Sequence, residues 1–299
     1  MVYEIKILDG QIQMNLDEDN LVYQSNNLIN ANYDMTALEQ KILLINISII
    51  NKKDTDFGLN VFRIKDLADL LQCSPELLYR DLPKLSKKII SKVVEVYNSE
   101  KDELEQFNII HYAKYKNKKG IVEFEINPRA KPYLLQLESF FSSFELKNAL
   151  RLVGKYSIRL YQIIKASLYK REMYIPLEEF KNTLKLTQKS YDRFNNITNK
   201  ILIPSTEEIN QKTDMELSYE TVLSGRKAIG IKFKMKDKHC VIKPKEISNG
   251  RKQQKQNNNQ SKRKDNKFFN FPEREYDYDY LEKVLTGEEE YDGRPYSKY

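Results

Sequence analysis

The spacing of apolar residues between positions 177 and 201 predicts two consecutive helices. Leu177, Phe180 and Leu184 share one face of a short helix over 177–186, and a polar turn over 187–190 follows it. The apolar stripe of the second helix consists of Phe194, Ile197 and Ile201. Two helices joined by a short turn have the order of a helix-turn-helix, whose second helix enters the major groove of DNA.

A β-hairpin with a basic turn is predicted directly after these helices. Apolar and polar residues alternate over 215–220 and again over 228–235. The turn between the two runs carries Ser224, Gly225, Arg226 and Lys227. A short helix, a polar-faced helix and a basic hairpin together are typical of a winged helix-turn-helix.

The outward face of the second helix carries amide and basic side chains. Its outward residues are Asp192, Asn195, Asn196 and Asn199, with Arg193 and Lys200 on the flanks. Asparagine can make a bidentate contact with adenine, and arginine or lysine can reach guanine or a phosphate, so this face suits DNA. The spacing leaves a second interpretation open, in which these are ordinary amphipathic elements of an α+β core.

A capping box and an apolar run predict a buried helix in the first half of the chain. Thr36 can cap the amide of Glu39, and Glu39 can reach back to the amide of Thr36. The helix that follows extends through Ile50. Residues 1–20 mix apolar and acidic residues without a sustained period, so we expect them to form a loosely held arm.

Two further helices and three strands follow this buried helix. The first helix covers 64–71, and the second begins with Ser74 as its cap and Pro75 as its first residue. Pro83 predicts a kink in the second helix. Basic residues project from it at Arg80, Lys84, Lys87 and Lys88. Strands are predicted over 93–97, 107–115 and 121–126, with a basic turn over 116–120 between the last two.

Helices followed by a sheet therefore occur twice, with the second copy about 110 residues downstream of the first. We predict an α+β fold of two tandem winged helix-turn-helix domains with a disordered C-terminal tail. Between the domains, the pattern predicts one long helix over 144–168, bent at Gly154, and a domain boundary near 138–143. The predicted parts are an N-terminal arm (1–20), an N-terminal domain (21–140), a C-terminal domain (141–247) and a tail (248–299).

Composition and charge agree with a polyanionic partner. The 299 residues carry a net charge of +7 with a pI near 9.0, and 40% of them are apolar, which is enough for real cores. In the tail, 251–267 hold seven basic residues and one acid, and 268–299 hold nine acids and four basic residues. The basic part is either a non-specific phosphate attractor or a solvated spacer.

Cysteine usage and hydropathy predict a soluble protein of the cytoplasm. Cys73 and Cys240 lie far apart, which argues against a disulfide framework and a cysteine-rich zinc site. The chain starts without a basic segment followed by an apolar run, and its longest uncharged stretch, over 42–51, is too short to span a bilayer. We expect no membrane partner.

The pattern contains no recognisable catalytic, metal or cofactor site. A rolling-circle nicking enzyme needs two closely spaced histidines that hold a metal, whereas His111 and His239 are widely separated. Gly154-Lys155 lacks the glycine and the Ser or Thr of a phosphate loop. We therefore expect no catalytic residue, no metal and no cofactor.

Several segments resemble the plasmid replication initiators of the RepE, pi and RepA winged-helix type. They are NLVYQSNNLINANYDMTALEQKILL, LLYRDLPKL, FELKNALRLVGKYSIRLYQIIK and EINQKTDMELSYETVLSGRKAIGIKF, within residues 20–235. The resemblance implies an initiator that binds repeated origin sites, called iterons, and helps the host initiator and helicase to open the origin. It also implies monomers that bind iterons and dimers, formed through the N-terminal domain, that repress their own gene.

The resemblance also assigns DNA-binding residues. The family's recognition helix falls on 191–200, although the basic stretch of the family is replaced here by Thr198-Asn199-Lys200, and the wing arginine is matched by Arg226. The expected contacts to double-stranded DNA are Tyr191, Arg193, Asn195, Asn196, Thr198, Asn199, Lys200, Gly225, Arg226 and Lys227, with auxiliary contacts from Arg80, Lys84, Lys87 and Lys88. Two other functions stay open: a winged-helix transcriptional repressor without an initiator role, and a nicking enzyme, which the missing histidine pair disfavours.

Overall fold

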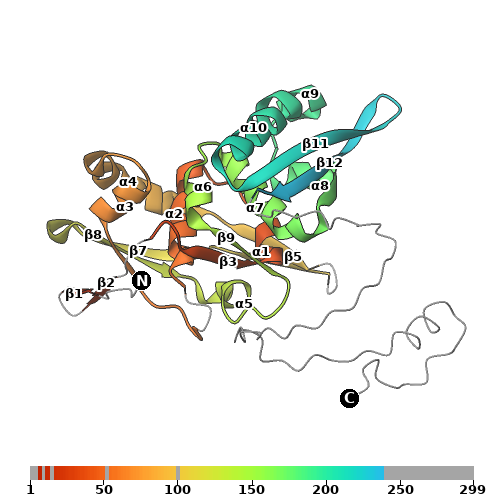
Figure 1. Ribbon diagram of the computed structural model, residues 1–299. Helices are drawn as coiled ribbons and strands as arrows, with labels where there is room; N and C mark the ends of the chain where they lie inside the picture. The colour runs from red at the N-terminus through yellow and green to blue at the C-terminus, as the bar shows by residue number, and fades with distance from the viewer. Residues whose placement is uncertain (1–5, 9–10, 14–16, 51–53, 99–101, 239–299) are drawn as a thin grey trace, which may run out of the picture. The chain divides into compact units, whose positions relative to one another are not determined.

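In the computed structural model, residues 6–8, 11–13, 17–50, 54–98 and 102–238 are described (Figure 1). The predicted tail and the residues His239 and Cys240 lie outside this part of the chain. The first described elements are two short paired strands, β1 (Lys6–Leu8) and β2 (Gln11–Gln13), in the segment expected to be a loose arm. The end of that segment is attached to the body, because the amides of Leu146 and Lys147 donate to the carbonyls of Asn20 and Glu18 at 2.9 and 2.8 Å.

The first half of the chain contains helices, a three-stranded antiparallel sheet and two two-stranded ladders. The helices are α1 (Asn26–Asn30), α2 (Ala37–Ser48), α3 (Ile64–Leu70), α4 (Pro75–Ser91) and the single-turn α5 (Lys131–Leu134). The strands are β3 (Leu21–Ser25), β4 (Asn60–Arg63), β5 (Val94–Asn98), β6 (Glu103–Phe107), β7 (Ile110–Lys116), β8 (Ile121–Ile126) and β9 (Phe141–Glu145). Strands pair in the orders β4-β8-β7, β5-β6 and β3-β9.

Local sequence signals place α2, α3 and α4 correctly, whereas the short helices α1 and α5 were not predicted. The capping box at α2 is confirmed: the Thr36 amide donates to Glu39 Oε2 at 2.9 Å, and the Glu39 amide donates to Thr36 Oγ1 at 3.4 Å. Most of α2 is buried, as its apolar run predicts. Ser74 caps α4 and Pro75 begins it, also as predicted, and α4 continues through Pro83 as one helix to Ser91.

The strand predicted over 107–115 is confirmed only from Ile110, where β7 begins, because Phe107 is the last residue of β6 in another sheet. The chain leaves β6, which pairs with β5, and then enters β7, which pairs with β8. The crossing is held by Asn108, whose side-chain amide donates to the Ile90 carbonyl at 3.1 Å and accepts from Asn127 Nδ2 at 2.8 Å. The predicted strand is therefore interrupted at Asn108, whose side chain bonds to the backbone carbonyl of Ile90.

The single bent helix predicted over 144–168 is also wrong. Its first residues belong to β9, which pairs with β3, and the remainder forms two helices, α6 (Leu146–Leu150) and α7 (Lys155–Ser167). Between them, Gly154 has an extended backbone with φ −75° and ψ 130° and caps α7. The boundary predicted near 138–143 consequently overlaps the first residues of β9, whose partner β3 is at the start of the N-terminal half.

The second half contains the predicted helices and hairpin. A three-stranded antiparallel sheet in the order β10-β12-β11 is built from β10 (Glu172–Pro176), β11 (Met215–Ser224) and β12 (Lys227–Asp237). The helices are α8 (Leu177–Thr183), α9 (Phe194–Ile197) and α10 (Ile203–Lys212), and a π-helical turn over Thr198–Leu202 joins the last two. Single 3-10 turns cover Asn117–Lys119, Pro128–Ala130, Leu168–Lys170 and Lys189–Asp192.

Buried apolar residues of both halves form one continuous core. Helix α7 is central to it, because it packs against α1 and α2 on one side and α10 on the other. Tyr161, which is fully buried, lies edge-on to Phe144 of β9 with ring centroids 5.5 Å apart. The core thus connects the two predicted winged helices through α7.

Candidate nucleic-acid interface

The turn before the predicted recognition helix lies between buried apolar residues. Phe180 and Leu184 of the α8 segment are buried, and the chain leaves the helix at Lys185, whose φ is +50°. Tyr191, in the 3-10 turn Lys189–Asp192, is only 8% exposed. The recognition helix therefore begins at Phe194, three residues later than the predicted start at Tyr191, because Tyr191 is held in the core.

The helix that begins at Phe194 is longer than predicted and continues to Lys212. Its π-helical turn over Thr198–Leu202 ends two residues before Pro204. Proline lacks an amide hydrogen, and its ring crowds the carbonyl four residues earlier, here that of Lys200. A wider turn at this point relieves the crowding and lets the helix continue, and π-turns of this kind often occur at functional sites.

Four of the predicted contacts on this helix are exposed to solvent, namely Arg193, Asn195, Asn199 and Lys200. The prediction that Asn196 faces outward is not met, because it is half-buried and its amide donates to the Ser190 carbonyl at 2.6 Å. Thr198 is half-buried as well, with its hydroxyl 3.3 Å from the Phe194 carbonyl. Asn196, Thr198 and buried Tyr191 therefore stabilise the start of the helix through contacts within the protein and do not face outward.

The wing is a long hairpin with an exposed basic tip, as predicted. Ser224, Gly225, Arg226 and Lys227 are all exposed, and Gly225 has φ +62°, in the left-handed region that glycine adopts without a steric penalty. The helical run over 194–212 is roughly 28 Å long, and the ten residues of β11 extend roughly 33 Å. Since β11 follows α10 through a tight corner and runs back along it, the tip lies near the α9 end of the helix (Figure 1).

Charge pairing separates the cations of the wing strands from those of its tip. Lys232, Lys234 and Lys236 on β12 have acidic neighbours, Glu172 at 2.6 Å, Glu220 at 2.6 Å and Glu216 at 3.9 Å. Within the described part of the chain, no carboxylate pairs with the cations of the helix start and the tip, which are Arg193, Lys200, Arg226 and Lys227. The positive charge available to a phosphate is therefore concentrated at one end of the domain.

The auxiliary basic residues predicted in the first half lie along α4. Arg80, Lys84, Lys87 and Lys88 are exposed, while Leu78, Leu82, Leu85 and Ile89 on the other face are buried. Arg80 is partly neutralised, because its guanidinium makes two hydrogen bonds of 2.9 Å to the carboxylate of Asp81. Lys84 also interacts with Asp81 and helps to lower the pKa of that carboxylate, whereas Lys87 and Lys88 have no carboxylate partner among the described residues.

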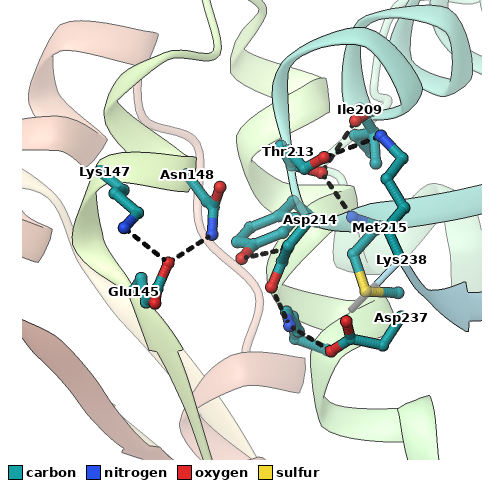
Figure 2. A network of polar contacts seen from close by, with 11 residues as sticks. Glu145, Lys147, Asn148, Ile209, Thr213, Asp214, Met215, Asp237 and Lys238 are labelled. Atoms are coloured by element: carbon teal, nitrogen blue, oxygen red, sulfur yellow. Dashed lines mark hydrogen bonds and ion pairs between the residues drawn. The ribbon is translucent and has the colours of Figure 1, made fainter. Parts of the chain in front are cut away.

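A polar network at the corner between α10 and β11 holds the base of the wing on α7 (Figure 2). Lys165 of α7, whose side chain is 9% exposed, lies 2.5 Å from Asp214 and 3.6 Å from Asp237. The Tyr161 hydroxyl donates to Asp214 Oδ1 at 3.1 Å, and burial together with this carboxylate raises the pKa of Tyr161. Lys238 Nζ closes the corner with a hydrogen bond of 2.8 Å to the Thr213 carbonyl.

A carboxylate of α10 itself contacts the start of α7. Glu208 accepts hydrogen bonds from the amides of Val153 at 2.6 Å and Gly154 at 3.1 Å, and Lys212 lies 2.8 Å away. Burial raises the pKa of Glu208, but the bonds from Lys212, Ser157 and the two amides outweigh it and lower the pKa to about 2. Sequence reasoning missed this contact, because its partners are more than 50 residues apart.

The described residues contain no group of three or more His, Cys, Asp or Glu that could hold a metal ion. His111 lies on β7 with Nε2 3.3 Å from Glu125 Oε2 on the neighbouring strand, so it takes part in a cross-strand contact. Among the described helices, none is long and apolar enough to cross a membrane.

Comparison with known proteins identifies two winged-helix regions in the chain. The profile of the family described as "Initiator Replication protein, WH1" matches residues 21–165, and that of "Initiator Rep protein, WH2" matches residues 176–235. A replication initiation protein of Escherichia coli is 27% identical over 209 residues, which are 66% of this chain and 64% of that protein. The crystal structure of the Pi initiator protein in complex with iteron DNA aligns with a TM-score of 0.62 and 21% identity, over 73% of this chain and 98% of that one.

These matches confirm the fold expected from the sequence, two winged helices in tandem. The WH1 match includes most of α7, whereas the WH2 match includes α8, the recognition helix and most of the wing. The chain belongs to the family of initiator replication proteins.

Proposed function

We propose that this protein initiates plasmid replication by binding iteron repeats at the origin. In the proposed complex, the start of the recognition helix enters the major groove and the wing tip lies along the phosphate backbone. The observation that carries the proposal is the presence of exposed amides and unpaired cations at one end of the WH2 domain. Family membership supports it, as does the Pi initiator, whose structure was determined with iteron DNA.

Asn199 and Asn195 are the proposed base-reading residues of the helix. Both are exposed, and no hydrogen bond within the described chain occupies either side chain. Their amides can donate to and accept from one adenine edge. Asn196, which already bonds to Ser190, instead supports the turn that precedes the helix.

Arg226 and Lys227 are the proposed phosphate contacts of the wing, and Lys84, Lys87 and Lys88 are those of α4. Such contacts give affinity without sequence information and make binding salt-dependent. Lys232 offers a matched comparison, since it lies on the same wing but is paired with Glu172.

The proposed activity needs no chemical step by this chain. Origin opening would come from the binding energy of several initiators on adjacent repeats together with the host initiator and helicase. Dimers formed through the N-terminal domain would repress the protein's own gene. A sizing experiment should use the complete chain, because a fragment that ends at residue 138 lacks β9, the partner of β3.

The decisive experiment is a footprint on the DNA that flanks the gene, followed by affinity measurements on the protected repeat. We expect direct repeats about 20 base pairs apart, close to two helical turns. Asn199→Ala should cost about 1 to 3 kcal/mol on the repeat and little on random DNA. Asn182→Ala, at an exposed position of α8, is its control.

The wing variants test the second half of the proposal. Arg226→Ala should weaken binding to the repeat and to random DNA alike and reduce the salt slope by about one, whereas Lys232→Ala should change little. Absence of protected repeats, or affinity that does not depend on salt, would contradict the proposal. Protected repeats on DNA that supports no replication would favour a repressor instead.

A further inference from the structure

The recognition helix is connected to the WH1 domain by a carboxylate that caps a helix there. The amides of Val153 and Gly154 at the start of α7 have no acceptor within their own helix, and both donate to the carboxylate of Glu208 on α10. A carboxylate at this position is also favoured by the positive end of the helix dipole. The cap leaves little room for a side chain at position 154, where an added Cβ atom would lie 3.1 Å from Glu208 Oε2 and 2.6 Å from Ser157 Oγ.

A second carboxylate from the same segment contacts α7 near the other end of that helix. Asp214, at the corner after α10, contacts Lys165 at 2.5 Å and accepts from the Tyr161 hydroxyl at 3.1 Å (Figure 2). Lys165 is ten residues after the start of α7, so the two attachments are roughly 15 Å apart along its axis. Two separated contacts restrict both the position and the rotation of one helix relative to another, whereas a single contact still allows the helices to rotate about it.

The opposite face of α7 is bonded to the rest of WH1. Arg159, 3% exposed, donates to the Tyr33 hydroxyl at 2.7 Å and to the Ala31 carbonyl at 2.8 Å. Lys155 lies 2.9 Å from Asp34, and its carbonyl accepts from Gln40 Nε2 at 3.1 Å. A restraint on α10 relative to α7 is therefore a restraint on the recognition helix relative to WH1.

We propose that Glu208 is a positioning residue that, with Asp214, fixes the orientation of the WH2 recognition helix and wing relative to WH1. The consequence for DNA rests on the proposed function: two winged helices held at one orientation accept one spacing between their contact sites. Other contacts between the domains, such as Lys185 with Glu95 at 2.5 Å, keep them associated when the cap is lost. Loss of the cap would then change orientation without separating the domains.

The first test measures orientation without DNA. Spin labels are placed at Cys73, which is exposed, and at the wing tip with Lys227→Cys, after Cys240→Ser removes the other native thiol. Electron–electron resonance should show one narrow distance distribution for this protein and for the control Glu207→Gln, at an exposed position next to Glu208. Glu208→Gln should broaden the distribution or shift its maximum, with unchanged far-ultraviolet circular dichroism.

A second variant keeps the proposal testable if Glu208→Gln folds poorly. Gly154→Ala keeps the charge of Glu208 but adds a Cβ atom 2.6 Å from Ser157 Oγ and 3.1 Å from Glu208 Oε2, so the groups of the cap must shift. It should broaden the same distribution. Identical narrow distributions in both variants and in the control would overturn the proposal, whatever the protein does with DNA.

The final measurement uses the repeat protected in the footprint and the same repeat with one base pair inserted between the two contact regions. The wild-type protein should prefer the intact repeat, and Glu208→Gln should reduce that preference about fivefold or more, the size of a modest coupling between sites. A variant that loses affinity for both DNAs equally has lost stability or contacts instead, and that result contradicts a positioning role. If the wild type binds neither DNA, the proposed function fails while the distance measurement still decides the inference.

Discussion

Replacing Glu208 by glutamine should lower the free energy of unfolding by about 2 kcal/mol at neutral pH and by very little near pH 2. The substitution preserves the size of the side chain and removes its charge. The pKa of Glu208 falls from its ordinary value of 4.5 to about 2 in the folded protein, a difference that corresponds to roughly 3 kcal/mol. Part of it comes from Lys212, whose side chain is 39% exposed and screened by solvent, so we expect about 2 kcal/mol.

The pH dependence follows from the direction of this change. Because the folded-state pKa is lower than the unfolded one, the ionised carboxylate favours folding, and its contribution is complete above pH 4.5. The contribution decreases as the pH falls and the folded protein takes up the proton near pH 2. Most of the difference between wild type and variant should therefore disappear between about pH 5 and pH 2.

Urea unfolding at several pH values measures this difference. The chain contains 20 tyrosines and no tryptophan, so tyrosine fluorescence and far-ultraviolet circular dichroism serve as two signals. Coincident transitions would justify a two-state treatment. Glu207→Gln is the control and should cost less than about 0.5 kcal/mol at any pH. A gap between Glu208→Gln and wild type that stays the same at pH 7 and pH 3, or an equal loss in the control, would refute the assigned cause.

Three further substitutions test single structural details by urea unfolding at pH 7. Gly230→Ala should destabilise by about 1 kcal/mol, because its Cβ would lie 2.4 Å from the ring of Tyr174, and this exposed ring must give up its place on the strand. The same change should be nearly neutral when Tyr174 is already alanine, and an equal cost there would exclude the clash. Gly225→Ala should cost about 1 kcal/mol for its positive φ of 62°, and Gly225→Asn less; equal stabilities would argue against a left-handed turn. Thr36→Ala removes the cap of α2 and should also cost about 1 kcal/mol, and an unchanged midpoint would mean that the capping box contributes nothing.

Short-range signals determined much of this protein from its sequence. The capping box at Thr36, the Ser74-Pro75 start of α4 and the alternating runs around the Gly225 turn all specify structure through residues within a few positions of one another. For that reason α2, α3, α4, the wing and the tandem arrangement were predictable, whereas the short helices α1 and α5 were not predicted. The exposed asparagines and cations of the recognition helix were predictable as well, since helical spacing decides which face they share.

Contacts between distant residues decided the rest. Strand β9 exists because β3, more than 100 residues earlier, offers it a partner, and α6 and α7 are separate helices because Glu208 accepts the amides between them. The recognition helix begins at Phe194 because Tyr191 is buried. Ion pairing is likewise a tertiary property: the sequence shows many lysines on the wing, but only the folded sheet pairs Lys232, Lys234 and Lys236 with carboxylates and leaves Arg226 and Lys227 unpaired.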